Sequence, residues 1–442
     1  MNKVKISENM IARLWQCLTG KELVTDNGRV VQIIYPGRPS ADSGPDFHDA
    51  VISVNGQVVK GDIEVHTNSR QWFDHGHHKD PNYIQTILHL VWEHSPQFPT
   101  FLEGGRQVPV MSLGPLFCRR TSWLQWRPPC SQVSRCLSRE DLLQLLKTAG
   151  KDRFKTKVDC FSLNLTCQNA GQGLWQGIMR ALGYTKNVKP FEELSQRLPL
   201  SFLESLEANG DLAIKQAWLL GAAGLLPSQR LKGPTLLAKE PEVIKLERLW
   251  QANGIRETMT EGDWHFVGVR PTNFPTRRLV ALSCLLSRYH KLGLLQGILK
   301  LLRQMSAEPK YGRLEMSLMV LVKGYWAHHF DFGLKSRGDL ALLGREKAAE
   351  IIINIILPFV SAWANIAGES KLKETSFELF SNYPKLKDNE ITRHMRQQLQ
   401  LGNESKISLI HQQGSLHIFV TYCSTGGCSI CPIIKHPASS WV

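Results

Sequence analysis

Apolar and polar residues alternate along the first 115 residues in the pattern of a small β-sheet. A helical spacing of apolar residues over 7–19 precedes the first of these alternating runs. The second and third runs flank Asn55-Gly56, which is the preferred dipeptide of a type I′ hairpin turn. The pattern therefore predicts a mixed sheet with one or two flanking helices. The predicted strands are residues 30–35, 47–54, 57–67, 86–93 and 107–113.

From residue 138 onward the apolar positions change to a helical period, as at Leu142, Leu145 and Leu146. Prolines such as Pro275 and Pro358 are expected at helix ends. The predicted fold class is α+β, with a small N-terminal mixed sheet followed by a large all-α region. The expected divisions are a β-rich core at 1–115, a basic connector at 116–157, a helical domain at 158–415 and a cysteine-containing tail at 416–442.

A chain of 442 residues with 42% apolar and 21% charged residues is long enough for two or three domains with buried cores. The formal net charge of +14 is unevenly placed, because residues 1–115 contain ten Lys or Arg against twelve Asp or Glu. The remaining residues therefore carry a charge of +16. A basic surface beside a slightly acidic sheet suits a polyanionic partner, and nucleic acid is the expected one.

The first twenty residues lack the apolar core of a signal peptide, so a cytoplasmic location is expected. The most apolar stretch, 351–367, is interrupted by Asn354, Pro358 and Asn365, which favours a buried core helix over a membrane span. Ten scattered cysteines in such a chain indicate reduced thiols or metal ligands, not a disulfide framework.

The second hairpin strand carries Asp62, Glu64 and His66 at alternate positions, so that all three are expected on one face. Asp46 begins the partner strand and is expected close to residues 64–66. Hard divalent cations such as Mg²⁺ bind a few carboxylates and keep several waters, one of which can attack a phosphodiester. The alternative interpretation is that these residues form the solvated face of a half-exposed hairpin.

A Pro-Asp pair on one strand and Glu-x-basic on the next resembles the core of the PD-(D/E)xK nuclease superfamily. The resemblance implies a restriction-endonuclease-like fold in which Asp46 and Glu64 bind Mg²⁺ or Mn²⁺. Asp62, on the same strand face as Glu64, is expected to assist in metal binding. His66 then occupies the position of the lysine, which is a departure from the pattern. A histidine is mostly neutral at pH 7, so it would orient or deprotonate water instead of supplying a fixed positive charge.

The register of the hairpin decides whether this arrangement forms. A symmetric two-residue turn would place Asp49 opposite Asp62 and would put Asp46 on the face of Val65. A bulge or a three-residue turn would reverse this. Asp49 is therefore an alternative metal ligand.

A histidine-rich loop follows the hairpin and contains His75, His77 and His78. Together with His66 or His89, these imidazoles could instead form a site for Zn²⁺, Mn²⁺ or Fe²⁺. Loop histidines without a fixed spacing are also common as surface or capping residues.

The connector 116–157 contains ten Lys or Arg against three acidic residues, with Trp123, Trp126 and Phe154 among them. Such a segment could hold a phosphate backbone and stack on bases, or could be a solvated helix face beside buried tryptophans. The residues expected to contact nucleic acid are Arg119, Arg120, Arg127, Lys151, Arg153, Lys155 and Lys157.

Near the C-terminus, Cys423, Cys428 and Cys431 lie in a compact glycine-containing segment. Their spacing matches the first three ligands of plant-type iron–sulfur proteins, which need a fourth cysteine from elsewhere. His436 could instead complete a zinc site locally. Equally, the three could be structural thiols. The candidates for a distant fourth ligand are Cys118, Cys130 and Cys136.

Several segments along nearly the whole chain resemble a bacterial family known as domain of unknown function 2851. They are Ser43-Gly-Pro-Asp-Phe47, Gly61-Asp-Ile-Glu-Val-His66, Trp72 with His75-Gly-His77 and Asp80-Pro81, Ile87-Leu-His-Leu-Val-Trp-Glu93, Ala181-Leu-Gly-Tyr-Thr-Lys-Asn187, Arg270-Pro-Thr-Asn-Phe-Pro275 and the terminal cysteines. This resemblance implies no particular activity.

The leading hypothesis from the sequence is a metal-dependent nuclease-like protein in which Asp46 and Glu64 bind the cation and His66 positions water. The second hypothesis is a non-catalytic nucleic-acid-binding or scaffold protein with a structural metal site at the C-terminal cysteines. A metalloenzyme that uses the histidine loop on a small substrate is the third.

Overall fold

The chain divides into two compact units in the computed structural model, and each is described separately. Unit 1 combines Met1–Arg153 with Lys387–Val442, and unit 2 is Phe154–Leu386. The domain boundaries expected from the sequence did not place the two ends of the chain in one unit. The structure describes residues 7–16, 18–40, 44–117, 130, 137–184, 186–206, 212–230, 240–252, 257–305, 311–402, 407–425 and 427–436.

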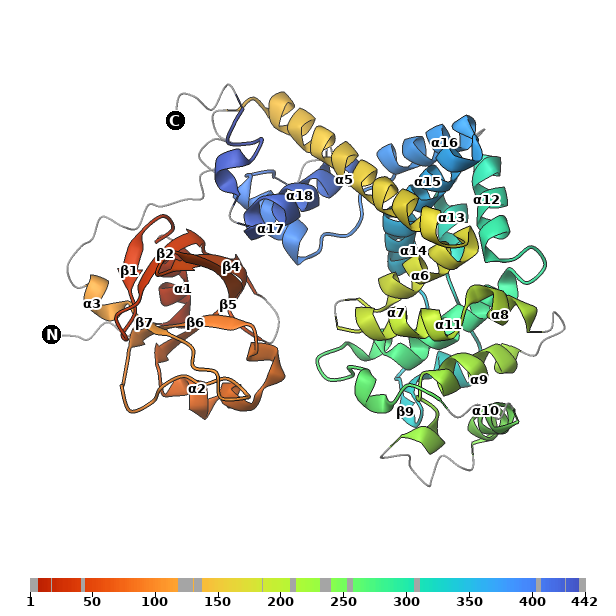
Figure 1. Ribbon diagram of the computed structural model, residues 1–442, viewed down its shortest axis with the longest axis horizontal. Coiled ribbons are helices and arrows are strands. Elements are labelled where there is room, and N and C mark those ends of the chain that lie inside the picture. The colour runs from red at the N-terminus through yellow and green to blue at the C-terminus, as the bar shows by residue number, and fades with distance from the viewer. Residues whose placement is uncertain are drawn as a thin grey trace. The chain divides into compact units, whose positions relative to one another are not determined.

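Unit 1 is built on a mixed seven-stranded sheet, seen in red and orange in Figure 1. The strands follow the order β1-β2-β4-β5-β6-β7, and β3 pairs with β4. The pairs from β1 to β5 are antiparallel, whereas β5, β6 and β7 run parallel to one another. The strands are β1 (Glu22–Val24), β2 (Val30–Tyr35), β3 (Arg38–Pro39), β4 (Phe47–Val54), β5 (Gln57–Asn68), β6 (Thr86–Glu93) and β7 (Val110–Ser112).

The predicted hairpin is confirmed, because β4 and β5 pair across Asn55 and Gly56. Both turn residues have positive φ angles, 49° and 86°, as a type I′ turn requires. The expected strands at 30–35 and 86–93 are also confirmed, whereas the short strands β1 and β3 were not expected.

Helix α1 (Glu8–Gln16) covers one face of the sheet. Its residues Ile11, Leu14 and Trp15 pack in one core with Ile63 and Val65 of β5. The indole of Trp15 also donates a hydrogen bond to the carbonyl of Pro36. Burying these apolar side chains contributes roughly 1.5–3 kcal/mol each to folding. The face of β5 that carries Ile63 and Val65 is therefore the one that packs against α1.

Strand β4 contains a bulge between Phe47 and Ala50. Ala50 pairs with Gly61, as the two-residue turn requires, but Phe47 pairs with Ile63, so β4 has one residue more than β5. Within the bulge, Asp49 adopts a positive φ of 59°. The bulge turns the residues that precede it to the face of the sheet opposite to the one that an unbulged strand would give. Asp46 therefore lies against Glu64.

The last helices of the chain complete unit 1. Helices α17 (Glu390–Gln398) and α18 (Leu409–Thr421) share a core with Tyr35 and Val51 of the sheet. Gly414 of α18 lies so close to α5 (Arg139–Cys167) that a Cβ there would be 1.9 Å from the carbonyl oxygen of Leu146. This close approach explains a glycine inside a helix, where it costs about 1 kcal/mol relative to alanine.

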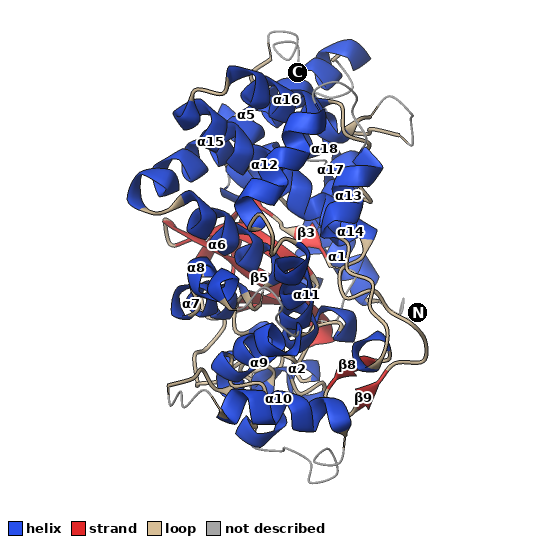
Figure 2. Ribbon diagram, turned by 90° about the vertical axis from the view of Figure 1, so that its right-hand side faces the viewer, coloured by secondary structure: helices blue, strands red, loops and turns tan. Residues whose placement is uncertain are grey.

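Unit 2 is almost entirely helical, as Figure 2 shows by the predominance of blue. The predicted α+β class with a helical region after the sheet is thus confirmed, apart from the short hairpin β8 (His329–Asp331) and β9 (Leu334–Lys335). The longer helices are α6 (Ala170–Leu182), α7 (Val188–Arg197), α8 (Leu200–Ser205), α9 (Leu212–Ala222), α10 (Pro241–Gln251), α11 (Pro275–Arg288), α12 (Leu294–Met305), α13 (Tyr311–Leu318), α14 (Arg345–Ile351), α15 (Leu357–Ala367) and α16 (Ser370–Ser381). The short helices of unit 1 are α2 (Gln71–Asp74) and α3 (Gly114–Phe117).

Arg277 begins a network that holds the β8–β9 hairpin against α11. Its guanidinium is buried and donates four hydrogen bonds, to the carbonyls of Trp326, His329, Leu340 and Ala341. Four or more such bonds satisfy a charge that would otherwise be costly to bury. The turn 270–275 therefore places the start of α11 where Arg277 can reach these carbonyls.

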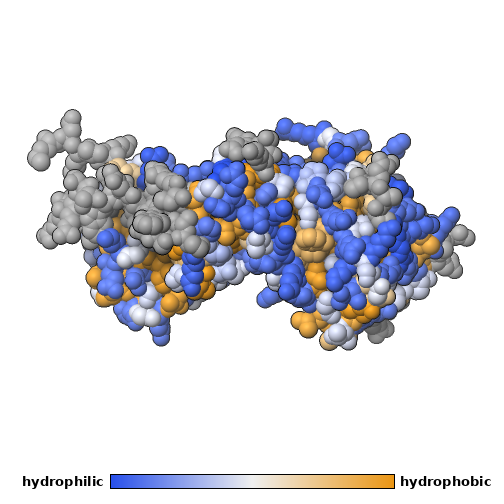
Figure 3. All heavy atoms as spheres, turned by 90° about the horizontal axis from the view of Figure 1, so that it is seen from above, coloured by the Kyte–Doolittle hydropathy of each residue, from blue (hydrophilic) through white to orange (hydrophobic). Residues whose placement is uncertain are grey.

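One helical segment, Arg345–Ala367, is long and apolar enough to cross a membrane by length and composition alone. Of its most apolar 18 residues, 67% are buried inside the structure, as expected for a core helix. Its centre is a π-helical turn, Ile352–Ile356, before Pro358. Pro358 has no N–H for the helix, and Lys157 donates instead to the carbonyl of Asn354. In the view of Figure 3, hydrophilic residues, drawn in blue, cover much of the protein surface.

We expect His394 to make the stability of the protein depend on pH. Burial and the charge of Arg38 lower the pKa of His394 to about 4, and its Nε2 lies 3.0 Å from the hydroxyl of Tyr35. Because the folded pKa is below the unfolded value, protonation favours the unfolded chain, and stability falls as the pH drops from 6.5 to 4. Between pH 6.5 and 4, the free energy of unfolding of a His394→Gln variant should fall by up to about 3 kcal/mol less than that of the parent protein. Urea unfolding at several pH values measures this difference.

The exposed His290 supplies the control, because His290→Gln should keep the pH dependence of the parent protein. If His394→Gln shows the same pH dependence as the parent, His394 is not the group responsible.

Candidate metal centre

Two carboxylates face each other across the bulged hairpin. The backbone N–H of Asp46 donates to Oε2 of Glu64 over 3.1 Å, and the N–H of Val65 donates to Oδ2 of Asp46 over 3.0 Å. These reciprocal bonds fix both side chains. Glu64 is only 5% exposed and His66 only 1%. The interpretation of this face as solvated is therefore wrong, because the residues after β5 cover it.

The covering segment is α2 with the short turns His77–Lys79 and Pro81–Tyr83. Trp72 is fully buried beneath it and donates to the carbonyl of Phe101. Gly76 adopts a left-handed φ of 75°, which turns the chain between His75 and His77. Tyr83 stacks on the ring of His77 with centroids 3.9 Å apart. The sequence therefore directs the imidazoles of His75 and His77 toward β5.

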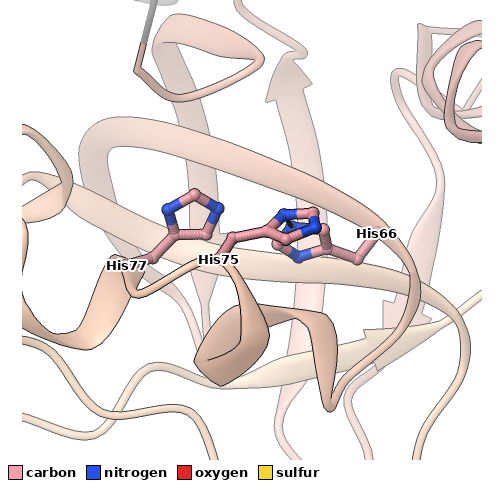
Figure 4. A group of neighbouring side chains, drawn as sticks. All are labelled: His66, His75 and His77. Atoms are coloured by element: carbon pink, nitrogen blue, oxygen red, sulfur yellow. Dashed lines mark hydrogen bonds between the residues drawn. The ribbon is translucent and has the colours of Figure 1, made fainter.

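Three imidazoles meet above the hairpin (Figure 4). One ring nitrogen each of His66, His75 and His77 forms a group whose members all lie within 4.8 Å of one another. His66 Nε2 is 3.1 Å from His75 Nδ1 and 3.5 Å from Glu64 Oε1. His77 Nε2 is buried without hydrogen-bond geometry, 3.2 Å from the same carboxylate oxygen.

These separations match the geometry of a single coordinated ion. Two donor atoms that are each about 2.1 Å from one ion lie about 3.0 Å apart at a right angle and about 3.4 Å apart at a tetrahedral angle. The three measured separations are 3.1, 3.2 and 3.5 Å. His66, His75 and His77 thus provide three donor atoms in one group, and Glu64 lies within 3.5 Å of two of them. His75 is exposed, so this side of the site is open to solvent.

A second layer of hydrogen bonds orients His66. Its Nδ1 lies 2.9 Å from His89 Nε2, and His89 Nδ1 lies 2.6 Å from the hydroxyl of Thr100. If the Nδ1–H of His89 donates to Thr100, then the Nδ1–H of His66 donates to His89. The lone pair of His66 Nε2 then points into the cluster. This chain is the kind of outer support that metal-binding histidines have.

Burial shifts the pKa values of acids and imidazoles in opposite directions. Desolvation raises the pKa of Glu64 to about 8, and desolvation together with the charge of Glu64 raises that of Asp46 to about 7. Desolvation and the neighbouring imidazoles lower the pKa of His66 to about 3, and burial also lowers the pKa of His77. The lowered pKa values favour the neutral form of His66 and His77, which is the form that binds metals.

The structure brings together Asp46, Glu64 and His66 of the predicted site residues, but not Asp62. The Asp62 carboxylate accepts from the N–H of Asp49 and lies 3.3 Å from His48 Nδ1. Asp49, the alternative ligand, instead pairs with Arg38 and Lys60. The bulge explains both differences, since it moves Asp46 and not Asp49 opposite Glu64.

Sequence reasoning missed Glu8. This residue begins α1, and its negative charge contributes to the raised pKa values of Asp46 and Glu64. Gln71 donates to Oε1 of Glu8 over 3.2 Å and so links α1 to the covering segment. No local pattern distinguishes Glu8 from an ordinary helix-start acid, so only the packing of α1 could have indicated it.

The basic residues of the predicted nucleic-acid surface differ in their surroundings. Lys151 and Lys155 of α5 are exposed, whereas Arg153 donates to Gln413 over 2.8 Å and Lys157 to the carbonyl of Asn354. Phe154 is buried against Phe377 and Phe380. Arg119, Arg120, Arg127, Trp123 and Trp126 lie outside the described residues.

Cys423, Cys428 and Cys431 follow α18 in the sequence, and Cys130, Cys423 and Cys431 are buried in one core. Cys118 and Cys136 lie outside the described residues.

A family model described as a protein of unknown function (DUF2851) matches residues 8–389. The chain belongs to the DUF2851 family. Neither a curated protein nor a solved structure matches this DUF2851 protein. The matched region begins at Glu8 and includes the whole sheet with the histidine cluster, but it ends before the cysteine tail.

We expect the DUF2851 protein to bind one Mn²⁺ per chain at His66, His75 and His77, with the neighbouring Glu64 as a further donor. His77→Ala and Glu64→Gln each remove one donor and should weaken binding by about 10- to 100-fold. Titration followed by electron paramagnetic resonance of free Mn²⁺ measures this. Mn²⁺ is the appropriate probe because thiolates prefer softer metals.

The neighbouring His78 provides a matched control. Its ring packs against Phe73 and is not part of the cluster, so His78→Ala should bind Mn²⁺ like the parent protein. Unchanged affinity in both His77→Ala and Glu64→Gln would contradict the assignment.

Proposed function

We propose that this DUF2851 protein is a metal-dependent nuclease that hydrolyses phosphodiester bonds in nucleic acid. The observation that carries the proposal is the meeting of Asp46 and Glu64 with three imidazoles at one point of the sheet. The order of elements also supports the resemblance to PD-(D/E)xK nucleases, since α1 precedes the antiparallel β2-β4-β5 and is followed by β6 parallel to β5.

The donor set favours Mn²⁺ over Mg²⁺ as the cation. Mg²⁺ strongly prefers oxygen ligands, whereas imidazole suits first-row transition metals. The bound cation would polarise the scissile phosphodiester and lower the pKa of a coordinated water. With three imidazoles and one carboxylate as ligands, the charge of the site remains positive enough to receive a phosphate group.

Each residue then has a specific role. Glu64, His66, His75 and His77 hold the cation, and His89 with Thr100 holds His66 in its ligating orientation. Asp46 lies beside them, fixed by Val65, and is assigned the proton transfer from the attacking water. A carboxylate fixed beside a metal-bound water is placed to accept its proton.

The charge distribution supports nucleic acid as the substrate. The net charge is +14, and the acidic excess is confined to the residues before 116. Exposed Lys151 and Lys155 are available for phosphate contacts, and Arg119, Arg120 and Arg127 are assigned to the same role. Arg153 and Lys157 already bind within the protein and contribute less.

A transition-metal enzyme that acts on a small substrate is the second candidate, and the three imidazole donors favour it. A non-catalytic nucleic-acid-binding protein with the same charge would bind nucleic acid but leave it intact. The following assays separate these functions.

We expect the purified protein to cleave single- or double-stranded DNA or RNA with Mn²⁺. Glu64→Gln and Asp46→Asn should each reduce the rate by at least about 100-fold, because they remove a ligand and the general base. Gel assays of labelled substrates measure the rates. Asp62→Asn is the matched control, since this nearby carboxylate lies outside the cluster.

Equal cleavage by the parent protein and both site variants would identify a contaminating nuclease and contradict the proposal. Tight binding of nucleic acid without cleavage in any metal would favour the non-catalytic function.

We also expect nucleic-acid binding to depend on salt and on the exposed lysines of α5. Replacing Lys151 and Lys155 together by alanine should weaken binding to all sequences alike and reduce the salt slope by about 1 to 2. Fluorescence anisotropy at several salt concentrations measures both. The double variant of the exposed Lys291 and Lys300 removes the same charge elsewhere and should change neither the affinity nor the slope.

A further inference from the structure

A row of flat side chains lies on the segment that covers the histidine cluster. The ring of Phe73, in α2, lies 6.3 Å from the ring of Phe98, in the loop after β6. The guanidinium carbon of Arg70 lies 5.6 Å from the centroid of the Phe98 ring. Arg70, Phe73 and Phe98 together are called the aromatic row below. The ring of His78 packs against Phe73 with centroids 5.0 Å apart and supports it.

The aromatic row begins beside a candidate metal ligand. Phe73 precedes His75 by two residues, so their Cα atoms are at most about 7 Å apart. The carbonyl of Phe73 accepts a hydrogen bond of 3.0 Å from the N–H of Gly76, the residue between His75 and His77. His75 is exposed and marks the open side of the metal centre. Phe73 is therefore held next to the side from which a substrate would reach the cation.

Exposure distinguishes this row from the aromatic residues that close the loop. Trp72 is fully buried and Tyr83 is 6% exposed, and they share the core that holds the covering segment on the sheet. Phe73 and Phe98 are only half-buried, although Phe73 also touches that core. The side chain of Arg70 is 64% exposed. The row thus presents ring and guanidinium surface to solvent beyond what closing the loop requires.

Such a surface fits unpaired nucleobases. Bases stack on aromatic rings and on arginine planes, but only when they are not already paired and stacked in a duplex. Arg70 and Lys79 also supply positive charge for the backbone of a strand. Arg70 lies 3.5 Å from Asp74, but an exposed pair of this kind is weak and can be exchanged for a phosphate.

We propose that the aromatic row binds unpaired bases of single-stranded nucleic acid beside the metal centre. The position of the scissile phosphodiester rests on the proposed nuclease function, and the row narrows its substrate class to single strands. A duplex offers no unpaired base to Phe73 and Phe98, so its binding depends on charge alone.

Binding measured without cleavage tests the proposal. In EDTA, fluorescence anisotropy should show tighter binding of a labelled single strand of about 12 nucleotides than of the matching duplex. Phe73→Leu and Phe98→Leu keep an apolar side chain but remove the flat ring. Each should weaken single-strand binding by about 5- to 100-fold and leave duplex binding unchanged.

The salt dependence separates stacking from charge. Phe98→Leu should keep the salt slope of the parent protein, whereas Arg70→Gln should reduce it by about 1. Trp363 supplies the matched control, because this half-buried ring of unit 2 lies 5.7 Å from the guanidinium carbon of Arg303 in the same kind of contact. Trp363→Leu should bind single strands like the parent protein.

A measurement on the parent protein guards against a variant that fails to fold. Irradiation with a single strand that contains 5-iodouracil should attach it to Phe73 or Phe98, as identified by mass spectrometry. Equal affinity for single strands and duplexes, unchanged single-strand binding in both leucine variants, or attachment only elsewhere would overturn the proposal. If the binding results hold but no metal supports cleavage, the nuclease function is wrong and the aromatic row remains a single-strand binding site.

Discussion

The candidate metal centre depends on one additional residue in strand β4. The turn at Asn55-Gly56 alone would leave Asp46 on the same face as Val65, which packs under α1. The bulge at Asp49 changes the pairing from Ala50↔Gly61 to Phe47↔Ile63 and turns Asp46 toward Glu64. The hydrogen bonds between Asp46, Glu64 and Val65 then hold this register. Because a one-residue shift reverses every side chain of a strand, a local change of backbone decides whether the acids meet.

The site also explains an otherwise unfavourable burial of polar groups. The rise in the pKa of Glu64 from 4.5 to about 8 corresponds to about 5 kcal/mol against its charged form. Neutral imidazoles beside it cannot offset that charge, since the pKa of His66 is low as well. A divalent cation would satisfy the carboxylate and the lone pairs together. The buried, non-hydrogen-bonded Nε2 of His77 has no comparable structural purpose. The polar face of β5 is therefore better suited to binding a cation than to stabilising the empty fold.

The sequence predicted most local elements, because their determinants are local. Alternation and Asn55-Gly56 were enough for the hairpin and for placing Glu64 and His66 on one face. The approach of Asp46 to them required the bulge, which the sequence offered only as an alternative to the symmetric turn. The position of Asp62 could not be predicted, since it depends on a bulge at residues with no glycine and on pairing with His48. The role of Glu8 depends on the packing of α1, and the closure of unit 1 by α17 and α18 depends on contacts such as Tyr35 with His394. Such contacts join residues more than 350 positions apart, which no periodicity reveals.

The two groups of candidate ligands differ in chemistry, and this difference separates the metals they would bind. The sheet offers imidazole nitrogen and a neighbouring carboxylate oxygen from residues 64–77, whereas the core beside α18 contains the thiols of Cys130, Cys423 and Cys431. Thiolates select zinc and iron–sulfur centres, and nitrogen and oxygen donors accept Mn²⁺ readily. The first group forms within one short stretch of chain, so it requires only the folding of the sheet. The second joins Cys130 to the tail, so a centre there would form only after both ends of unit 1 have come together. A cation at the sheet would therefore serve chemistry, while a centre at the cysteines would stabilise the association on which unit 1 depends.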